Sequence, residues 1–190
     1  MYQIALAQLN IHAGNPRRNV EAMKEAIAKA KEKQCDIIVF PELAIPGYLI
    51  GDIWDQADFI NECTACGDEI RQLSQDIAII YGNVAKEEGN INPDGRQRKY
   101  NAMFCAYNGT FVAPEHSPYP FYIKTLLPNY REFSDIRYFT SLMEVAMERH
   151  AFAEDFLSPM TLTFKDGRKL SIGPLICEDS WDDNYFVKPM

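Results

Sequence analysis

The sequence predicts an α/β protein in which a mixed β-sheet is covered by helices. Short apolar runs typical of buried strands alternate with helical patterns in the first half of the chain, and two hairpin signals follow in the second half. Neither a shift in composition nor a Gly/Ser-rich linker divides the 190 residues, and this length suits one domain. We therefore expect residues 1–190 to form part of a single domain.

The first part of the chain predicts a strand, a helix and a second strand. Residues 2–8 are small and apolar, which is typical of a strand covered on both faces. Asn15-Pro16 marks a helix start, because proline is tolerated in the first turn. Residues 17–33 then place apolar side chains every three or four positions, which predicts an amphipathic helix. The apolar run 35–40 predicts a buried strand that ends at Pro41.

The middle of the chain continues this alternation. Residues 57–76 predict a second helix, and residues 77–82 predict another buried strand. The polar segment 86–99 contains two glycines and a proline, which predicts a surface loop.

Two turn signals and one helical segment complete the predicted elements. Asn108-Gly109 and Asp166-Gly167 each lie between two short apolar runs, a pattern that favours β-hairpins. Residues 141–158 are helical in pattern, and we interpret them as a surface insertion.

Charge and hydropathy exclude two classes of partner. The 19 basic and 27 acidic side chains give a net charge of −8, which argues against binding nucleic acid through bulk electrostatics. No apolar run reaches the roughly 18–20 residues that span a bilayer. The first four residues lack the basic and apolar segments of a secretory signal. We expect a cytoplasmic protein with no nucleic-acid or membrane partner.

Cysteine and histidine usage argues against several kinds of site. The number of cysteines, five, is odd, and the chain is not a short secreted one, so a disulfide framework is not expected. Cys63 and Cys66 form a lone CxxC without the further ligands that zinc requires, and we interpret them as buried helical thiols and expect no metal. The three histidines lack HExxH or HxH spacing, which argues against a histidine-based hydrolase.

Three reactive side chains lie at the ends of predicted strands in apolar surroundings: Glu42, Lys124 and Cys177. Each has a structural alternative, namely a turn cap, a strand-edge lysine that reaches water, and an inert buried thiol. The functional interpretation is a general base, a cation that stabilises an oxyanion, and a nucleophile at a strand-to-helix turn.

Together these groups can hydrolyse an amide without histidine. Glu42 takes the thiol proton, Cys177 attacks the carboxamide carbon, and Lys124 with a backbone N–H holds the oxyanion. Protonated Glu42 then donates to the departing ammonia and activates the water that hydrolyses the thioester. This hypothesis requires the three groups to converge in one cleft.

The segments that contain these residues resemble the nitrilase (carbon–nitrogen hydrolase) superfamily. The matching stretches follow the order of the family and cover residues 4–10, 39–48, 124–133, 137–139 and 175–181. Within the superfamily, LPNYREF at 127–133 and CEDSW at 177–181 resemble the amino-terminal glutaminase domain of glutamine-dependent NAD⁺ synthetases.

The resemblance implies a four-layer αββα sandwich and assigns the site residues. It makes Glu42, Lys124 and Cys177 the catalytic triad, and it places Glu132 where the superfamily often has a second, substrate-orienting glutamate. The residues that match the glutamine pocket are Tyr48, Tyr130, Phe133, Glu178 and Trp181. The alternatives are core packing for the aromatic residues and an acid at a helix start for Glu178.

The resemblance also implies that residues 1–190 are a truncated hydrolase domain, incomplete at its carboxyl end. We find no Ser-Gly-Gly-x-Asp-Ser loop and no Walker pattern, so the synthetase domain is expected to lie outside this chain. No cofactor is expected for the hydrolase domain, and ATP and Mg²⁺ are expected only for the synthetase domain. Superfamily members pair sandwich against sandwich, which leads us to expect self-association.

The predicted activity is hydrolysis of glutamine to glutamate and ammonia, with the ammonia passed to a synthetase domain in cis that amidates deamido-NAD⁺. A stand-alone aliphatic amidase or carbamoyl hydrolase with the same triad is the alternative. A non-catalytic interaction domain is a third possibility, against which the presence of all three reactive residues argues.

Overall fold

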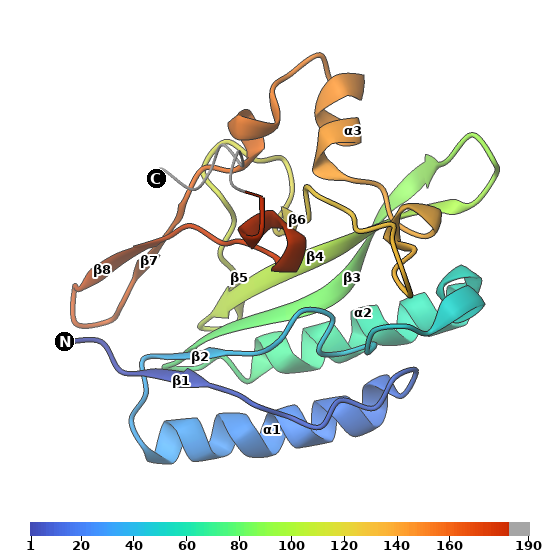
Figure 1. Ribbon diagram of the computed structural model, residues 1–190. Coiled ribbons are helices and arrows are strands. Elements are labelled where there is room, and N and C mark those ends of the chain that lie inside the picture. Colours follow the sequence, from blue (N-terminus) through green and yellow to red (C-terminus); the bar gives the residue numbers. More distant parts are fainter. Residues whose placement is uncertain (183–190) are drawn as a thin grey trace.

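The computed structural model describes residues 1–182, which are built around a six-stranded mixed sheet (Figure 1). Three strands run parallel to one another: β1 (Ile4–Leu6), β2 (Ile37–Val39) and β3 (Ala78–Ile91). β4 (Gln97–Tyr107) pairs antiparallel with β3, with β5 (Thr110–Phe111) and with β6 (Tyr122–Ile123). The predicted mixed α/β sheet is therefore confirmed.

Two long helices, α1 (Pro16–Glu32) and α2 (Ala57–Gln72), cover one face of this sheet (Figure 1). The Asn15 side chain caps α1 by accepting the Arg18 N–H at 3.2 Å, so the predicted helix start is confirmed. α2 ends four residues earlier than predicted. The chain leaves the helix there because Ser74 accepts the N–H groups of Asn108 and Gly109 at 2.8 and 2.9 Å.

The other side of the sheet carries a small second sheet and a short helix (Figure 1). β7 (Met160–Thr163) and β8 (Lys169–Ile172) form the two-stranded sheet. The short helix is α3 (Leu142–Glu148). Both predicted hairpin turns are present. None of the helices in the described part of the chain is long and apolar enough to cross a membrane.

The segment 86–99 is not the predicted surface loop. β3 and β4 extend into it as a long hairpin, and only residues 92–96 form the turn. Two of the polar side chains of this segment are paired within the fold: the Tyr100 hydroxyl donates to Glu87 at 2.6 Å, and Lys99 contacts Asp55 at 3.1 Å.

The segment 141–158 is not a purely surface insertion either. α3 and the 3₁₀ turn Ala153–Phe156 bury an apolar face that joins the main core, with Leu142 and Val145 each 1% exposed. Arg98 of β4 donates to both oxygens of Glu148 and ties α3 to the β3–β4 hairpin.

β1 was expected to be covered on both faces, and the structure covers it on one. Ile4 is 52% exposed and Leu6 is 73% exposed, whereas Ala5 between them packs against the core. A run of small apolar residues cannot by itself distinguish a central strand from an edge strand, and β1 is at the edge of the sheet.

One buried amide of α1 holds the two loops that enter the site. Asn19 accepts the His12 N–H at 2.8 Å, and its NH₂ group donates to the carbonyls of His12 and Ile45, both at 2.9 Å. These bonds clamp the loop after β1 against the loop after β2. Gly47 allows the close contact, because a Cβ there would lie 2.6 Å from Ala13 Cα.

The Asn19→Ala substitution should destabilise the fold by about 1–3 kcal/mol, because it leaves buried backbone groups unpaired. Asn61→Ala is the matched control, since Asn61 is exposed and its oxygen accepts only from Lys86 in the described part of the chain; it should change the free energy of unfolding by less than about 0.5 kcal/mol. Urea unfolding of both variants measures the difference, and equal unfolding free energies would contradict the clamp.

Candidate functional site

Glu42 lies at the turn that follows β2. The strand direction continues through Phe40, whose N–H donates to Ile80 at 2.8 Å, and the chain then turns at Leu43, which has a positive φ of 47°. The Glu42 side chain is 18% exposed, so its carboxylate lies at the edge of the core rather than in open solvent.

Gly82 of β3 is what allows this turn to lie against the sheet. A Cβ at position 82 would come within 2.2 Å of Leu43 N and 2.7 Å of Glu42 Cα, both backbone atoms that cannot move independently. The carboxylate is therefore placed by a close approach between two backbones.

Lys124 follows β6 directly and is fully buried. Its Nζ lies 2.7 Å from Glu42 Oε1 and 3.2 Å from Asp135 Oδ2. Burial alone would lower the pKa of Lys124, but the two carboxylates outweigh it and the pKa is raised. The structure therefore holds an ammonium cation between two acids inside the protein.

Cys177 begins the 3₁₀ turn Cys177–Ser180 and has a positive φ of 47°. The residue is exposed, and it lines the same cavity as Glu42. Partial burial and then the charge of Glu42 raise the pKa of Cys177, against the opposite effect of Lys124. A raised pKa favours the thiol over the thiolate, so the sulfur needs a proton acceptor before it can attack. Residues 173–176 before it are not in a strand, so the expected strand end at this position is wrong.

Glu42, Lys124 and Cys177 are brought together from three separate segments. Glu42 and Cys177 line the same cavity of about 150 Å³, and Lys124 donates to Glu42. Both Lys124 and Asn101 donate to Glu42 Oε1, at 2.7 and 2.6 Å, so neither of these bonds uses the second carboxylate oxygen.

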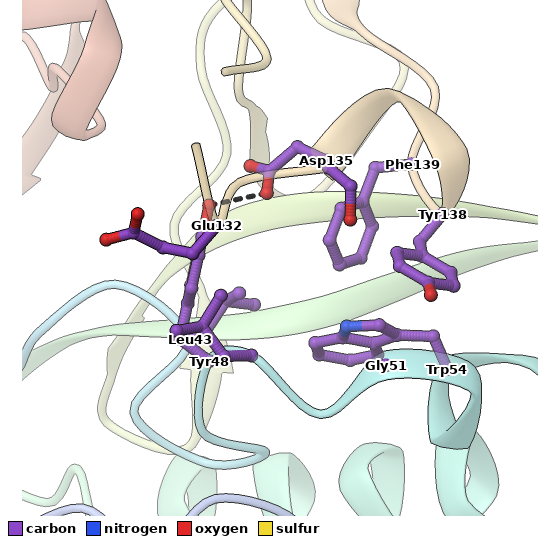
Figure 2. Close-up of a pocket in the computed structure, with 10 residues that line it drawn as sticks. Leu43, Tyr48, Gly51, Trp54, Glu132, Asp135, Tyr138 and Phe139 are labelled. Carbon is purple, nitrogen blue, oxygen red and sulfur yellow. Dashed lines mark hydrogen bonds between the residues drawn. The ribbon is translucent and has the colours of Figure 1, made fainter. Parts of the chain in front are cut away.

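The acid that contacts Lys124 is Asp135, not Glu132. Asp135 is buried and also accepts the Tyr48 hydroxyl at 2.5 Å, as Figure 2 shows. Glu132 is exposed, lines a neighbouring pocket of about 290 Å³, and points its carboxylate away from Asp135 (Figure 2). Asp135 is therefore an additional acid of the cluster, and the substrate-orienting role expected for Glu132 stays a prediction.

The residues expected to bind substrate form a row beside this cluster. The Phe133 ring makes edge contacts with Tyr48 and Tyr130, with centroids 5.8 and 5.6 Å apart. The Tyr130 hydroxyl donates to Glu178 at 2.8 Å. Trp181 is 78% exposed and lines an outer groove together with Tyr130 and Glu178. Core packing, the alternative for the aromatic residues, does not describe the exposed Tyr130 and Trp181.

Three polar residues of this region were not predicted: Asn101, Asp135 and Asp179. Asn101 donates to Glu42, and its side-chain oxygen is buried without a partner in the described part of the chain. The unusual position of an asparagine inside a strand was a possible signal, but it lay next to the segment interpreted as a loop. Asp135 sits in a polar stretch and carries no signal of burial. Asp179 could be read only as an acid at a helix start.

Comparison with known proteins identifies a family. The sequence model for the family described as carbon-nitrogen hydrolase matches residues 3–190. The chain is similar to the glutamine-dependent NAD⁺ synthetase of Acinetobacter baylyi, with 29% identity over 184 residues that cover 96% of this chain and 28% of that protein. The corresponding protein of Synechocystis sp. is 29% identical over 190 residues, which cover 98% of this chain and 29% of that protein. The chain thus spans less than a third of the length of these relatives.

Solved structures show the same fold. The glutamine-dependent NAD⁺ synthetase from Acinetobacter baumannii superposes with a TM-score of 0.71 and 26% identity, covering 99% of this chain and 30% of that chain. A variant of an amidase from Nesterenkonia sp. AN1, which carries acrylamide added at its active-site cysteine, gives a TM-score of 0.67 with 21% identity, covering 97% of this chain and 61% of that chain. The predicted nitrilase-type α/β fold is confirmed.

The Gly82→Ala substitution should destabilise the protein by about 1–3 kcal/mol or more, because the added methyl group overlaps the backbone at Glu42 and Leu43. Gly173→Ala is the matched control, because a Cβ there meets nothing within 4 Å. Thermal and urea unfolding of the two variants provide the measurement. Similar losses in both would show that the close approach at position 82 is not tight.

Alkylation of Cys177 should respond to the charge of Glu42. The other four cysteines are buried, so iodoacetamide should label Cys177 selectively, with a Cys177→Ser blank. Because the Glu42 charge raises the pKa of the thiol, Glu42→Gln should shift the midpoint of the rate-against-pH curve to lower pH. Glu115→Gln, an exposed change, should leave the midpoint where it is in the wild type. An unchanged or higher midpoint in Glu42→Gln would be inconsistent with this contact.

Proposed function

The chain belongs to the carbon-nitrogen hydrolase family, and from this membership and the geometry of the site we propose that it hydrolyses the side-chain amide of glutamine. The observation that carries the proposal is one carboxylate, Glu42, that accepts from a buried ammonium group and lines one cavity with an exposed thiol. Its similarity to glutamine-dependent NAD⁺ synthetases over nearly its whole length favours glutamine over other amides.

The first half of the proposed reaction forms a thioester. The Cys177 thiol is protonated at rest, and Glu42 accepts its proton as the sulfur attacks the carboxamide carbon. The carbonyl oxygen becomes an oxyanion, which Lys124 and a backbone N–H at the nucleophile turn stabilise. Glu42 then returns the proton to the amide nitrogen, the C–N bond breaks, and ammonia leaves.

The second half regenerates the thiol. A water molecule loses a proton to Glu42 and attacks the thioester carbon, and the same cation stabilises the second oxyanion. The C–S bond breaks, the sulfur takes the proton back, and glutamate is released. Glu42 acts as base and acid in alternation, so it must remain in contact with sulfur, water and leaving group in turn.

We assign recognition of glutamine to the row of residues beside the cluster. Glu178 offers a carboxylate to the α-ammonium group of the substrate, and Tyr130 orients that carboxylate through its hydroxyl. Tyr48 and Phe133 supply the wall along the aliphatic part of the side chain, and burial together with Asp135 raises the pKa of Tyr48, so its hydroxyl stays a donor.

Trp181 covers the outer groove in this proposal, and Glu132 orients the substrate from the rim of the neighbouring pocket. Asp135, which the structure places against Lys124, keeps the ammonium in position when Glu42 is protonated.

For the protein as a whole, we propose that ammonia passes to a synthetase domain in cis, which amidates deamido-NAD⁺ with ATP and Mg²⁺. This follows the names of the relatives, of which the chain covers 28–29%. Self-association and a cytoplasmic location remain part of the same proposal.

A stand-alone aliphatic amidase is the second candidate. The chain shares 32% identity over 108 residues with the aliphatic nitrilase of Rhodococcus rhodochrous, which covers 52% of this chain and 28% of that protein. A panel of glutamine and small aliphatic amides separates the candidates, because only a glutamine pocket needs a partner for an α-ammonium group.

Ammonia release from glutamine by the full-length protein tests the proposal. Cys177→Ala should abolish turnover, and Lys124→Met should lower kcat on the order of 10²–10³-fold by removing an oxyanion donor. Lys33→Met is the control, because Lys33 is an exposed lysine directly after α1; this variant should retain wild-type turnover. Undiminished turnover in Cys177→Ala would refute the mechanism, and faster turnover of small amides than of glutamine would favour the second candidate.

A further inference from the structure

A buried carboxylate, Asp179, lies two residues after Cys177 and has no part in the chemistry described above. It is 3% exposed although aspartate is rarely buried without a partner. One oxygen accepts the Leu126 N–H at 2.8 Å, and the other accepts the Thr125 N–H at 3.4 Å. These two residues follow Lys124 directly in the chain.

Asp179 therefore joins two segments that are 53 and 54 residues apart in sequence. One is the 3₁₀ turn that presents Cys177, which the Asp179 N–H closes by donating to Ile176 at 3.1 Å. The other is the chain that leaves β6 through Lys124. The carboxylate is a buried polar link between the segment of the sulfur and the segment of the ammonium, in addition to the exposed Tyr130–Glu178 bond.

The energetics indicate that this link has a cost for stability. Burial raises the pKa of Asp179 to about 6, although the Leu126 and Thr125 amides and the charge of Lys124 oppose the rise. A neutral acceptor in this place would satisfy the same amides without burying a charge.

We propose that Asp179 is a positioning residue that holds the Cys177 turn in register with Lys124. The inference rests on the proposed function, because it takes Cys177 and Lys124 as the groups that act on the substrate. Asp179 itself touches neither the thiol nor the ammonium in any hydrogen bond within residues 1–182, and it acts through the backbone that carries them.

The consequence is specific to the chemical step. If the turn moves relative to Lys124, the attacking sulfur and the oxyanion donor are no longer aligned, and a displacement of about 1 Å costs on the order of 10²-fold in rate. The groove that contains Tyr130 and Trp181 is lined by these same segments, including Thr125 and Leu126, so KM should also rise, by a smaller factor than kcat falls.

The test compares Asp179→Asn and Asp179→Ala with the wild type in the full-length protein. Asp94→Asn is the matched control, because Asp94 also accepts a backbone N–H, that of Arg96 at 3.0 Å, but in an exposed hairpin turn. Three quantities are measured: kcat and KM for ammonia release, the rate of Cys177 alkylation, and amide hydrogen exchange across residues 125–126.

We expect Asp179→Ala to lower kcat on the order of 10²-fold with a smaller change in KM, to alter the alkylation rate and to speed exchange at Leu126. Asp179→Asn, which keeps the size and one acceptor oxygen, should show a smaller loss in the same direction. Values equal to those of Asp94→Asn would overturn the inference, and so would a rise in KM with unchanged kcat.

Two outcomes remain decisive if the variants or the assay fail. If neither variant folds, the exchange of Leu126 in the wild type decides, because an unprotected amide there would show that the link does not exist in solution. If the wild type releases no ammonia from glutamine, the proposed function fails, while alkylation and exchange still support or overturn the role of Asp179.

Discussion

The buried ammonium group of Lys124 is the constraint around which the site is organised. An isolated charge in the interior is costly, and here two carboxylates compensate it at hydrogen-bonding distance. Each of them must then be delivered by the backbone to the same point. Glu42 comes from the turn after β2, and Asp135 comes from the 3₁₀ turn Asp135–Arg137. The two turns therefore lie where their carboxylates neutralise Lys124, and this placement fixes Glu42 beside the ammonium group.

The frame that meets this constraint is made of close backbone contacts rather than of long side chains. Gly82 lets the turn of Glu42 lie on β3, and Asn19 joins the loop after β1 to the loop after β2 through three hydrogen bonds. Asp179 joins the turn of Cys177 to the chain after Lys124 by accepting the Leu126 N–H. Such contacts have little freedom to adjust, which is what a site needs when its groups must keep a fixed separation during the reaction.

Periodicity and turn chemistry predicted the elements well where the signal is local. The cap at Asn15 and the Asn108-Gly109 turn depend on neighbours within a few residues, and the structure confirms both. The prediction of a loop over residues 86–99 was wrong because a charge in this segment can be neutralised by a residue far away in sequence: Lys99 pairs with Asp55, 44 positions earlier. A charge that is paired through the fold looks in the sequence like a charge in water.

The same distinction separates the site residues that were predicted from those that were not. Glu42 and Lys124 stand out because they interrupt apolar runs, whereas Asp135 lies among polar neighbours and is recognised only by its contacts with Lys124 and Tyr48. The family resemblance located a second acid in this segment at Glu132. Asp135, which contacts the cation, is a further acid that the motif did not indicate.

In the proposed mechanism, the presence of a second acid also links proton transfer to oxyanion stabilisation. At rest, Lys124 is shared between Glu42 and Asp135, so its charge is largely engaged. When Glu42 takes the thiol proton it becomes neutral, and its attraction for the ammonium falls. Lys124 then remains anchored by Asp135 while its charge becomes available to the oxyanion that forms in the same step. If Glu42 were the only partner of Lys124, the ammonium would lose its anchor when Glu42 becomes neutral. If neither acid changed charge, the ammonium would stay paired with the carboxylates and would be less available to the oxyanion.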